Sequence, residues 1–150
     1  MKTLLKFVSL SLLALLTATA VHAADRIGKV KIASGEVTIL RDGVTIEAKS
    51  GEELFERDII TTGANSAIGM TFSDNSRVSL GPDSTLELEN YAQNKPGKPD
   101  GFDLRIRKGS LTAASGEIAK TRPLAMRVLM PTTVLGVKGT QFAVRVGESG

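Results

Sequence analysis

The sequence contains no cysteine and no tryptophan, and its only histidine is His22. Without cysteine the chain cannot be a disulfide-stapled scaffold. Beyond residue 22 it also lacks the usual zinc ligands and the histidine that Ser-His-Asp and Cys-His nucleophile arrangements need. Walker-type phosphate loops and the dinucleotide fingerprint are missing as well. These absences favour a non-enzymatic protein without a cofactor and leave carboxylate pairs as the enzymatic option.

Aromatic residues are also scarce, with five phenylalanines and one tyrosine, Tyr91. Domains that bind carbohydrate usually present exposed aromatic rings, which offer a flat apolar face with a polar edge. A carbohydrate-binding or cell-wall-binding β-domain is therefore the alternative interpretation of this chain and not the first.

The N-terminus has the pattern of a secretory signal peptide. Lys2 and Lys6 precede an apolar run over residues 7–16, and small residues follow, with cleavage expected after Ala23 or, as a second candidate, after Ala20. The apolar run is too short for the roughly 20 residues of a membrane-spanning helix. We therefore predict a signal peptide over residues 1–23, a mature domain over residues 24–150, a periplasmic location and no stable membrane span after cleavage.

The charge balance of the mature chain is close to neutral. Lys2 and Lys6 leave with the signal, while all 16 acidic residues remain, so 17 basic residues give a balance of +1. This small excess argues against a nucleic acid partner. A basic outer strand face is nevertheless expected, either solvated or facing an anionic partner; its members are Arg105, Arg107, Lys108, Arg127 and Arg145.

Alternation of apolar and polar residues dominates the mature chain. Ile68, Met70 and Phe72 alternate with small residues, and Asp42-Gly43 separates two further alternating runs, which is a strong hairpin signal. No helical period is sustained. Roughly ten short strands joined by tight turns predict an all-β fold, either a twisted β-sandwich or a short solenoid-like stack.

Three stretches interrupt this pattern. Residues 90–101, which begin with Asn90 and Tyr91 and end at Gly101, carry two prolines and no large aliphatic residue, and they predict an exposed loop with a possible binding role. Residues 115–123 predict a second loop, and Lys108-Gly109 predicts a turn between two strands.

Two ordered segments carry a family resemblance. The middle motif comprises Asp58, Ile60, Thr62, Gly63, Ser66, Phe72, Asp74, Ser76, Leu80, Ser84 and Leu86, and the closing motif comprises Pro131, Thr132, Gly136, Val137, Lys138, Gly139, Thr140, Phe142 and Val144. In this order and spacing the chain resembles the FecR domain family from about Gly28 to Val146.

The resemblance implies a bacterial periplasmic β-domain used in signalling and protein interaction. In the best-known members this domain belongs to a transmembrane sigma-factor regulator that senses a TonB-dependent outer-membrane receptor. Because the N-terminal segment here is interpreted as cleavable, we expect a soluble interaction or sensor module with an envelope protein partner of unknown identity.

The remaining candidate site residues are mostly aspartates and serines in turns, where they also have a structural role. Asp58, Asp74 and Asp83 are possible glycosidase carboxylates, and Asp74 and Ser76 with Asp83 and Ser84 are possible calcium ligands, but aspartate also bonds its own backbone in turns. Lys138 is expected to pair with a buried acid, Asp58 or Asp74, or to be solvated. The glycines of the motifs are assigned to backbone geometry.

Overall fold

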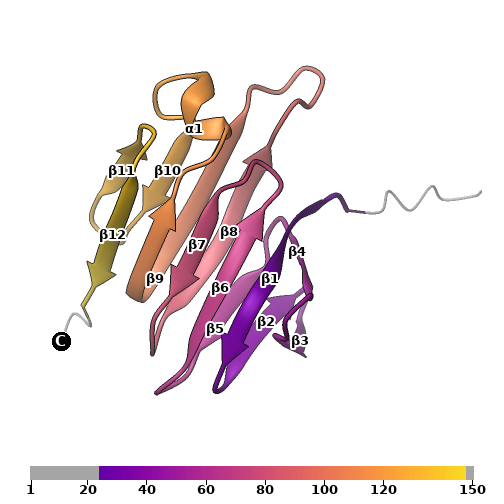
Figure 1. Cartoon of the computed structure of the whole chain (residues 1–150), viewed down its shortest axis with the longest axis vertical. Coiled ribbons are helices and arrows are strands. Elements are labelled where there is room, and N and C mark those ends of the chain that lie inside the picture. Colours follow the sequence, from indigo (N-terminus) through magenta and orange to yellow (C-terminus); the bar gives the residue numbers. More distant parts are fainter. Residues whose placement is uncertain (1–23, 148–150) are drawn as a thin grey trace, which may run out of the picture.

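The alternating runs form twelve strands and one short helix within residues 24–147, the part of the chain that this computed structural model describes (Figure 1). The all-β prediction is confirmed. The predicted signal peptide lies outside the described residues. The elements are β1 (Arg26–Ser34), β2 (Val37–Arg41), β3 (Val44–Glu47), β4 (Glu53–Phe55), β5 (Ile59–Thr62), β6 (Ala67–Phe72), β7 (Arg77–Leu80), β8 (Thr85–Ala92), β9 (Gly101–Ala114), α1 (Ile118–Thr121), β10 (Met126–Leu129), β11 (Val134–Val137) and β12 (Gln141–Val146).

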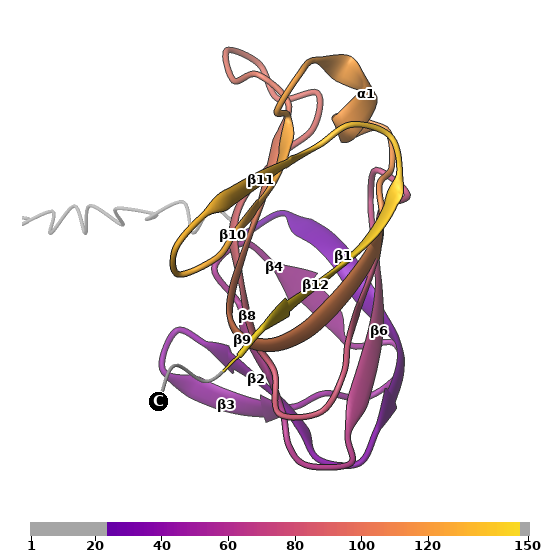
Figure 2. The same ribbon diagram turned by 90° about the vertical axis from the view of Figure 1, so that its left-hand side faces the viewer.

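The strands form one sheet that curls on itself around β9. Its order is β3-β2-β5-β8-β9-β7-β6-β1-β4, with β10 and β12 also paired to β9 and β11 paired to β10. The first part of β9 pairs with β8 and β10, and its last part pairs with β7 and β12. The two halves of the sheet therefore face each other (Figure 2). This arrangement is closer to the predicted sandwich than to a solenoid-like stack.

The predicted turn at Lys108-Gly109 is instead a bend within one long strand. Gly109 has a φ of +92°, and a Cβ at this position would lie 2.5 Å from the Cα of Ser84. The Ser110 amide, just beyond the bend, donates to Ser84 Oγ at 3.0 Å. Glycine is needed here because only it adopts this φ and allows this close approach without strain. The bend carries β9 from one half of the sheet to the other.

The inward-facing positions of both halves build a single core. Ile68, Met70 and Phe72 of β6 are buried as their alternation predicts. The Asp42-Gly43 hairpin is also confirmed, since both residues have positive φ, as the two-residue hairpin turn requires.

Tyr91 is a core residue, and the loop predicted over residues 90–101 is shorter than expected. β8 continues to Ala92, and the Tyr91 side chain is only 3% exposed. Its ring lies 5.0 Å from that of Phe102 and 6.3 Å from that of Phe72, measured between centroids. The aromatic cluster overrides the polar sequence around it, so the loop occupies only residues 93–100.

The predicted loop over residues 115–123 contains the four-residue helix α1. Ile118 and Ala119 are buried in the core, while the segment after Thr121 is exposed. Two apolar residues are too few to show a helical period in the sequence, which is why the helix was missed. The described helices include none with the length and apolar character that crossing a membrane requires.

Candidate protein-interaction surface

Asp58 of the middle motif is a buried anchor for an arginine. Its carboxylate accepts two hydrogen bonds from Arg41, both of 2.8 Å, and one of 2.9 Å from the Phe55 amide. The hydrogen bond to Asp58 raises the pKa of Arg41, whose guanidinium also lies 4.5 Å from the Phe55 ring centroid. This bidentate pair fixes the segment between β4 and β5 to β2. The predicted pairing of Lys138 with Asp58 is therefore wrong.

Asp74 and Ser76 form a second buried anchor, in the turn between β6 and β7. Asp74 Oδ1 accepts from the Ser76 amide at 3.0 Å, and Oδ2 accepts from Ser76 Oγ at 2.7 Å and from the Ile118 amide at 3.2 Å. Ser76 Oγ in turn accepts from the Gly116 amide at 2.9 Å. The two side chains therefore hold the start of α1 against the core. They leave no pairing of Asp74 with Lys138.

Thr62 and Gly63 connect three turns. The Thr62 hydroxyl donates to the Gly81 carbonyl at 2.7 Å and accepts from the Ser84 amide at 3.0 Å. The Gly63 amide donates to the Glu36 carbonyl, and its carbonyl accepts from the Asp83 amide. With Phe72 in the core, every side chain of the predicted middle motif therefore serves the fold.

The carboxylates named as glycosidase or calcium candidates do not converge. Asp74 and Ser76 precede β7, whereas the exposed Asp83 and the buried Ser84 follow it, so the two pairs lie at opposite ends of one strand. The described residues contain no cluster of three or more metal-binding side chains. Asp58 and Asp74 are bound to donors of the protein itself, as their turn positions favour.

The closing motif is mostly exposed, although its Val137 is buried in the core. Its predicted site residues Pro131, Gly136, Lys138, Gly139 and Thr140 are exposed, and Phe142 is half-buried. Pro131 lies in the turn between β10 and β11, and the Lys138–Thr140 turn leads into β12. This end of the chain lies on one side of the molecule, where β11 and β12 are the outer strands (Figures 1 and 2).

Large apolar side chains are exposed on the β10–β11 hairpin and beside it. Leu124 is 60% exposed, Val134 is 56% exposed and Leu135 is 36% exposed. Leu124 lies over Gly136, since a Cβ added at Gly136 would be 2.1 Å from Leu124 Cδ2. The missing side chain of Gly136 leaves room for Leu124 on this face of β11. Val134 shares the face with Gly136, because residues two apart in a strand point to the same side, and Leu135 points to the opposite side.

Three cations surround a hollow next to these apolar residues. Lys120, Arg122 and Lys138 line an open hollow of about 450 Å³ between α1 and the turn before β12. Lys120 pairs with Glu117 at 3.1 Å and Arg122 donates to the Asp100 carbonyl, whereas Lys138 has no ion pair within residues 24–147. We define the closing surface as Lys120, Arg122, Leu124, Val134 and Lys138.

The basic strand face predicted from the sequence is largely neutralised. Arg105 pairs with Glu89, Arg107 with Glu87 at 2.7 Å, and Arg127 with Asp103 through two bonds of 2.7 and 2.8 Å. Hydrogen bonds to these acids raise the pKa of Arg105 and of Arg127. The arginines therefore face acidic neighbours and do not form a free cationic patch.

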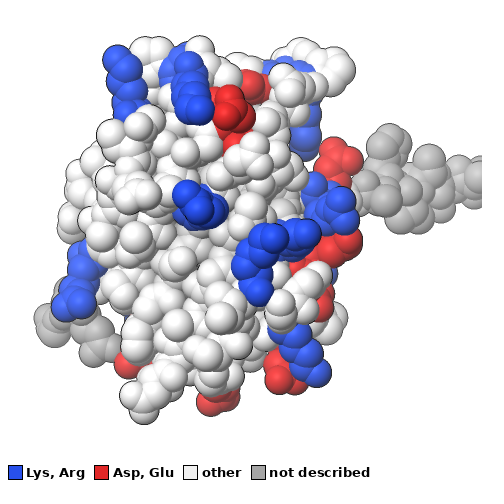
Figure 3. Space-filling model, viewed as in Figure 1, with Lys and Arg blue, Asp and Glu red and all other residues white. Residues whose placement is uncertain are grey.

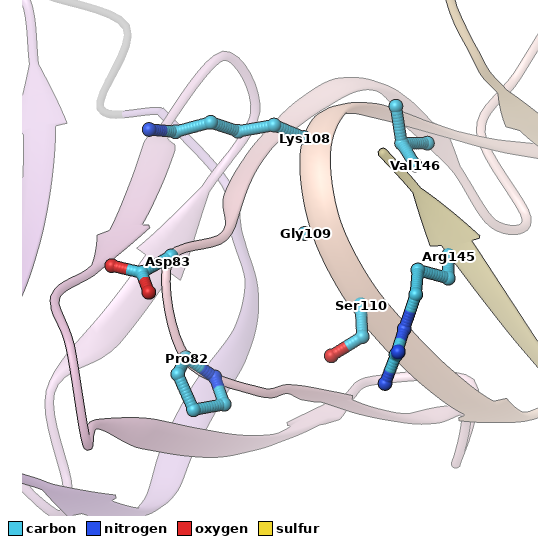
Figure 4. A pocket seen from close by; sticks show the side chains of 7 residues that line it. All are labelled: Pro82, Asp83, Lys108, Gly109, Ser110, Arg145 and Val146. Carbon is cyan, nitrogen blue, oxygen red and sulfur yellow. The ribbon is translucent and has the colours of Figure 1, made fainter. Parts of the chain in front are cut away.

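Lys108 and Arg145, the other two members of that face, line a separate open pocket of about 480 Å³ together with Asp83. Figure 4 shows that the Lys108 amine and the Arg145 guanidinium point away from each other. The pocket therefore lacks the convergent cations of an anion site. In the view of Figure 3, charged side chains gather at the side of β1 and at the top, while the area over β12 carries few.

Exposed aromatic rings are missing from the described part of the chain. Phe72, Tyr91 and Phe102 are buried, and Phe55 and Phe142 are half-buried. The structure thus provides no flat aromatic platform on residues 24–147 for a sugar ring.

The comparisons with known proteins give one match. The family model FecR, described as FecR protein, matches residues 58–150, and no curated protein or solved structure matches the chain. The matched region begins at Asp58, but the fold begins earlier, because β1 pairs with β6 and β2 pairs with β5. The earlier strands therefore complete the sheet on which the matched region folds.

Proposed function

Because the chain belongs to the FecR family, a family of signalling regulators, we propose that it is a non-enzymatic interaction or sensor module of the bacterial envelope. It acts in the periplasm after export by its N-terminal signal, and it binds an envelope protein through the closing surface.

The observation that carries this proposal is the contrast within the family pattern. The polar side chains of the middle motif are bonded within the protein, whereas the closing motif presents exposed residues such as Pro131 and Lys138 beside the few that pack on the core. Exposed apolar residues that are gathered together and bordered by charge are typical of protein interaction sites. Leu124 and Val134, which lie on the same face of β11, supply the apolar part.

The charges of the closing surface favour an acidic partner. Lys120, Arg122 and Lys138 border one hollow, and Lys138 has no ion pair within residues 24–147. A partner that places a carboxylate in this hollow and an apolar side chain against Val134 would satisfy both features. Complementary charge of this kind mainly sets the association rate and the choice of partner.

In-cell photo-crosslinking tests the proposal. A photoreactive amino acid at Val134 is compared with one at Val44, a valine of similar exposure on β3. We expect one dominant envelope protein to be crosslinked from Val134 and not from Val44, as identified by mass spectrometry. Equal recovery of scattered abundant proteins from both positions would contradict the proposal.

A further inference from the structure

β12 is a long and weakly protected edge strand. It pairs with β9 on one side, and no strand among residues 24–147 pairs with its other side. The edge strand β4 has only three residues, and Glu47 of the edge strand β3 is charged and paired with Lys49. β12 has six residues and a single charge, Arg145. Short length and charge protect edges against pairing, and β12 has little of either.

The pattern of hydrogen bonds shows which backbone groups of β12 are free. The Ser115 amide donates to the Thr140 carbonyl, just before β12 begins. Bonded pairs recur at every second residue of an antiparallel ladder, so the even-numbered residues of β12 are the ones whose backbone groups bond to β9. The other side of β9 agrees with this assignment. The Gly81 amide donates to the Ser110 carbonyl, so the even-numbered residues of β9 bond to β7. Its odd-numbered residues are then left to bond to β12. Because bonding alternates along an antiparallel strand, Gln141, Ala143 and Arg145 direct their N–H and C=O groups outward.

We propose that this edge pairs with β12 of a second copy of the chain, in an antiparallel arrangement centred on Ala143. In this register Ala143 lies opposite Ala143 of the second copy, and Gln141 lies opposite Arg145 of the second copy. All outward backbone groups are then paired within the two strands. No like charges face each other. The arrangement has the two-fold symmetry that is commonest among homodimers.

The side chains of β12 suit the same register. Phe142, Val144 and Val146 point toward the core but remain half-buried, because the sheet ends at this strand. Pairing centred on Ala143 places Phe142 opposite Val144 of the second copy, and aromatic residues pair favourably with β-branched ones. A register centred on Arg145 would oppose two cations, and one centred on Val144 would need Gly147, which lies outside β12.

Disulfide trapping tests the register, because the chain has no cysteine of its own. Paired residues in a bonded antiparallel ladder have Cα atoms about 5.5 Å apart, which a disulfide can span. Ala143→Cys should therefore form a covalent dimer under mild oxidation. Gln141→Cys, which is equally exposed, should not, because the two Gln141 positions would lie roughly 14 Å apart. Equal trapping of both variants, or none of Ala143→Cys, would overturn the proposal.

The solution mass provides a second measurement. The purified full-length chain should approach twice the monomer mass as its concentration rises. Ala143→Pro should remain monomeric, because proline removes an N–H that the edge uses and β9 does not. Circular dichroism checks that this variant is folded. If it is not, the comparison of Ala143→Cys with Gln141→Cys still tests the proposed pairing. A wild-type chain that stays monomeric throughout would also overturn the proposal. The proposed function is independent of this result, because the closing surface contains no residue of β12.

Discussion

The middle and closing motifs both contain glycine, threonine and phenylalanine, yet their polar residues lie in different environments. In the middle motif, Asp58, Asp74 and Ser76 are buried and their polar atoms are satisfied within the protein. In the closing motif, Gly136 and Lys138 are exposed. The two motifs therefore differ in the exposure of their polar residues, and under the proposed function only the closing motif meets the partner. Substitutions in the two motifs should therefore affect different measurements.

Asp74→Ala should have the largest effect on stability. It leaves the Ser76 and Ile118 amides and the Ser76 hydroxyl without their acceptor in a fully buried site. We expect the free energy of unfolding to fall by roughly 4 kcal/mol, measured by urea denaturation. Asp83→Asn, at an exposed turn, is the matched control and should change it by less than about 0.5 kcal/mol. A loss of similar size in both variants would contradict the structural role of Asp74.

A glycine substitution in the bend of β9 sharpens the comparison. Gly109→Ala forces a Cβ against the backbone of Ser84 at a φ of +92°, and it should reduce the free energy of unfolding by roughly 3 kcal/mol. The variant would be measured by the same denaturation. A neutral effect would show that the bend in β9 does not depend on glycine.

The buried Tyr91 makes the stability of the fold depend on pH. Burial, with a contribution from the charge of Asp74, raises the pKa of Tyr91 well above its usual value near 10. Because the folded state holds this proton more tightly than the unfolded chain, the stabilisation is complete below about pH 10 and is lost as the pH rises further. Tyr91→Phe should cost about 1–2 kcal/mol near neutral pH, where the Asp74 amide loses its acceptor, and should reduce the alkaline loss.

Tyrosinate absorbance measures the pKa directly, because Tyr91 is the only tyrosine and tryptophan is absent. Titration of the folded chain with the pKa of free tyrosine would contradict the burial of this ring.

Gly136→Ala should have the smallest effect on stability. The added Cβ meets only the end of the exposed Leu124 side chain, which can move. We expect a change of less than about 1 kcal/mol in the free energy of unfolding, together with a lower yield of the crosslink from Val134. A loss of stability as large as that of Gly109→Ala would show that the closing motif also holds the fold.

The sequence predicted the elements of the fold better than their connections. Alternation located β6 and Asp-Gly located the β2–β3 turn, because both signals are local. The bend at Gly109 and the burial of Tyr91 depend on Ser84 and Phe72, which are distant in sequence, so no local pattern could show them.

The candidate site was predicted only as a list of motif residues. The sequence suggested Lys138 as a partner of Asp58, whereas the partner in the structure is Arg41. Which cation lies beside Asp58 depends on how the strands pack, and no local pattern shows it. Leu124 was missed entirely. Its exposure follows from its position over Gly136, and the sequence offers no signal for that contact.

The measurement that tests the account most directly is the crosslinking yield from Val134 after reversal of a single charge. Lys138→Glu should abolish the crosslinked partner while leaving the unfolding curve unchanged, because Lys138 is exposed and has no ion pair in the described structure. Lys29→Glu, which reverses an exposed lysine on β1, is the matched control and should keep the full yield. A full yield from the Lys138→Glu variant would contradict the division between a buried middle motif that holds the fold and a closing surface that binds the partner.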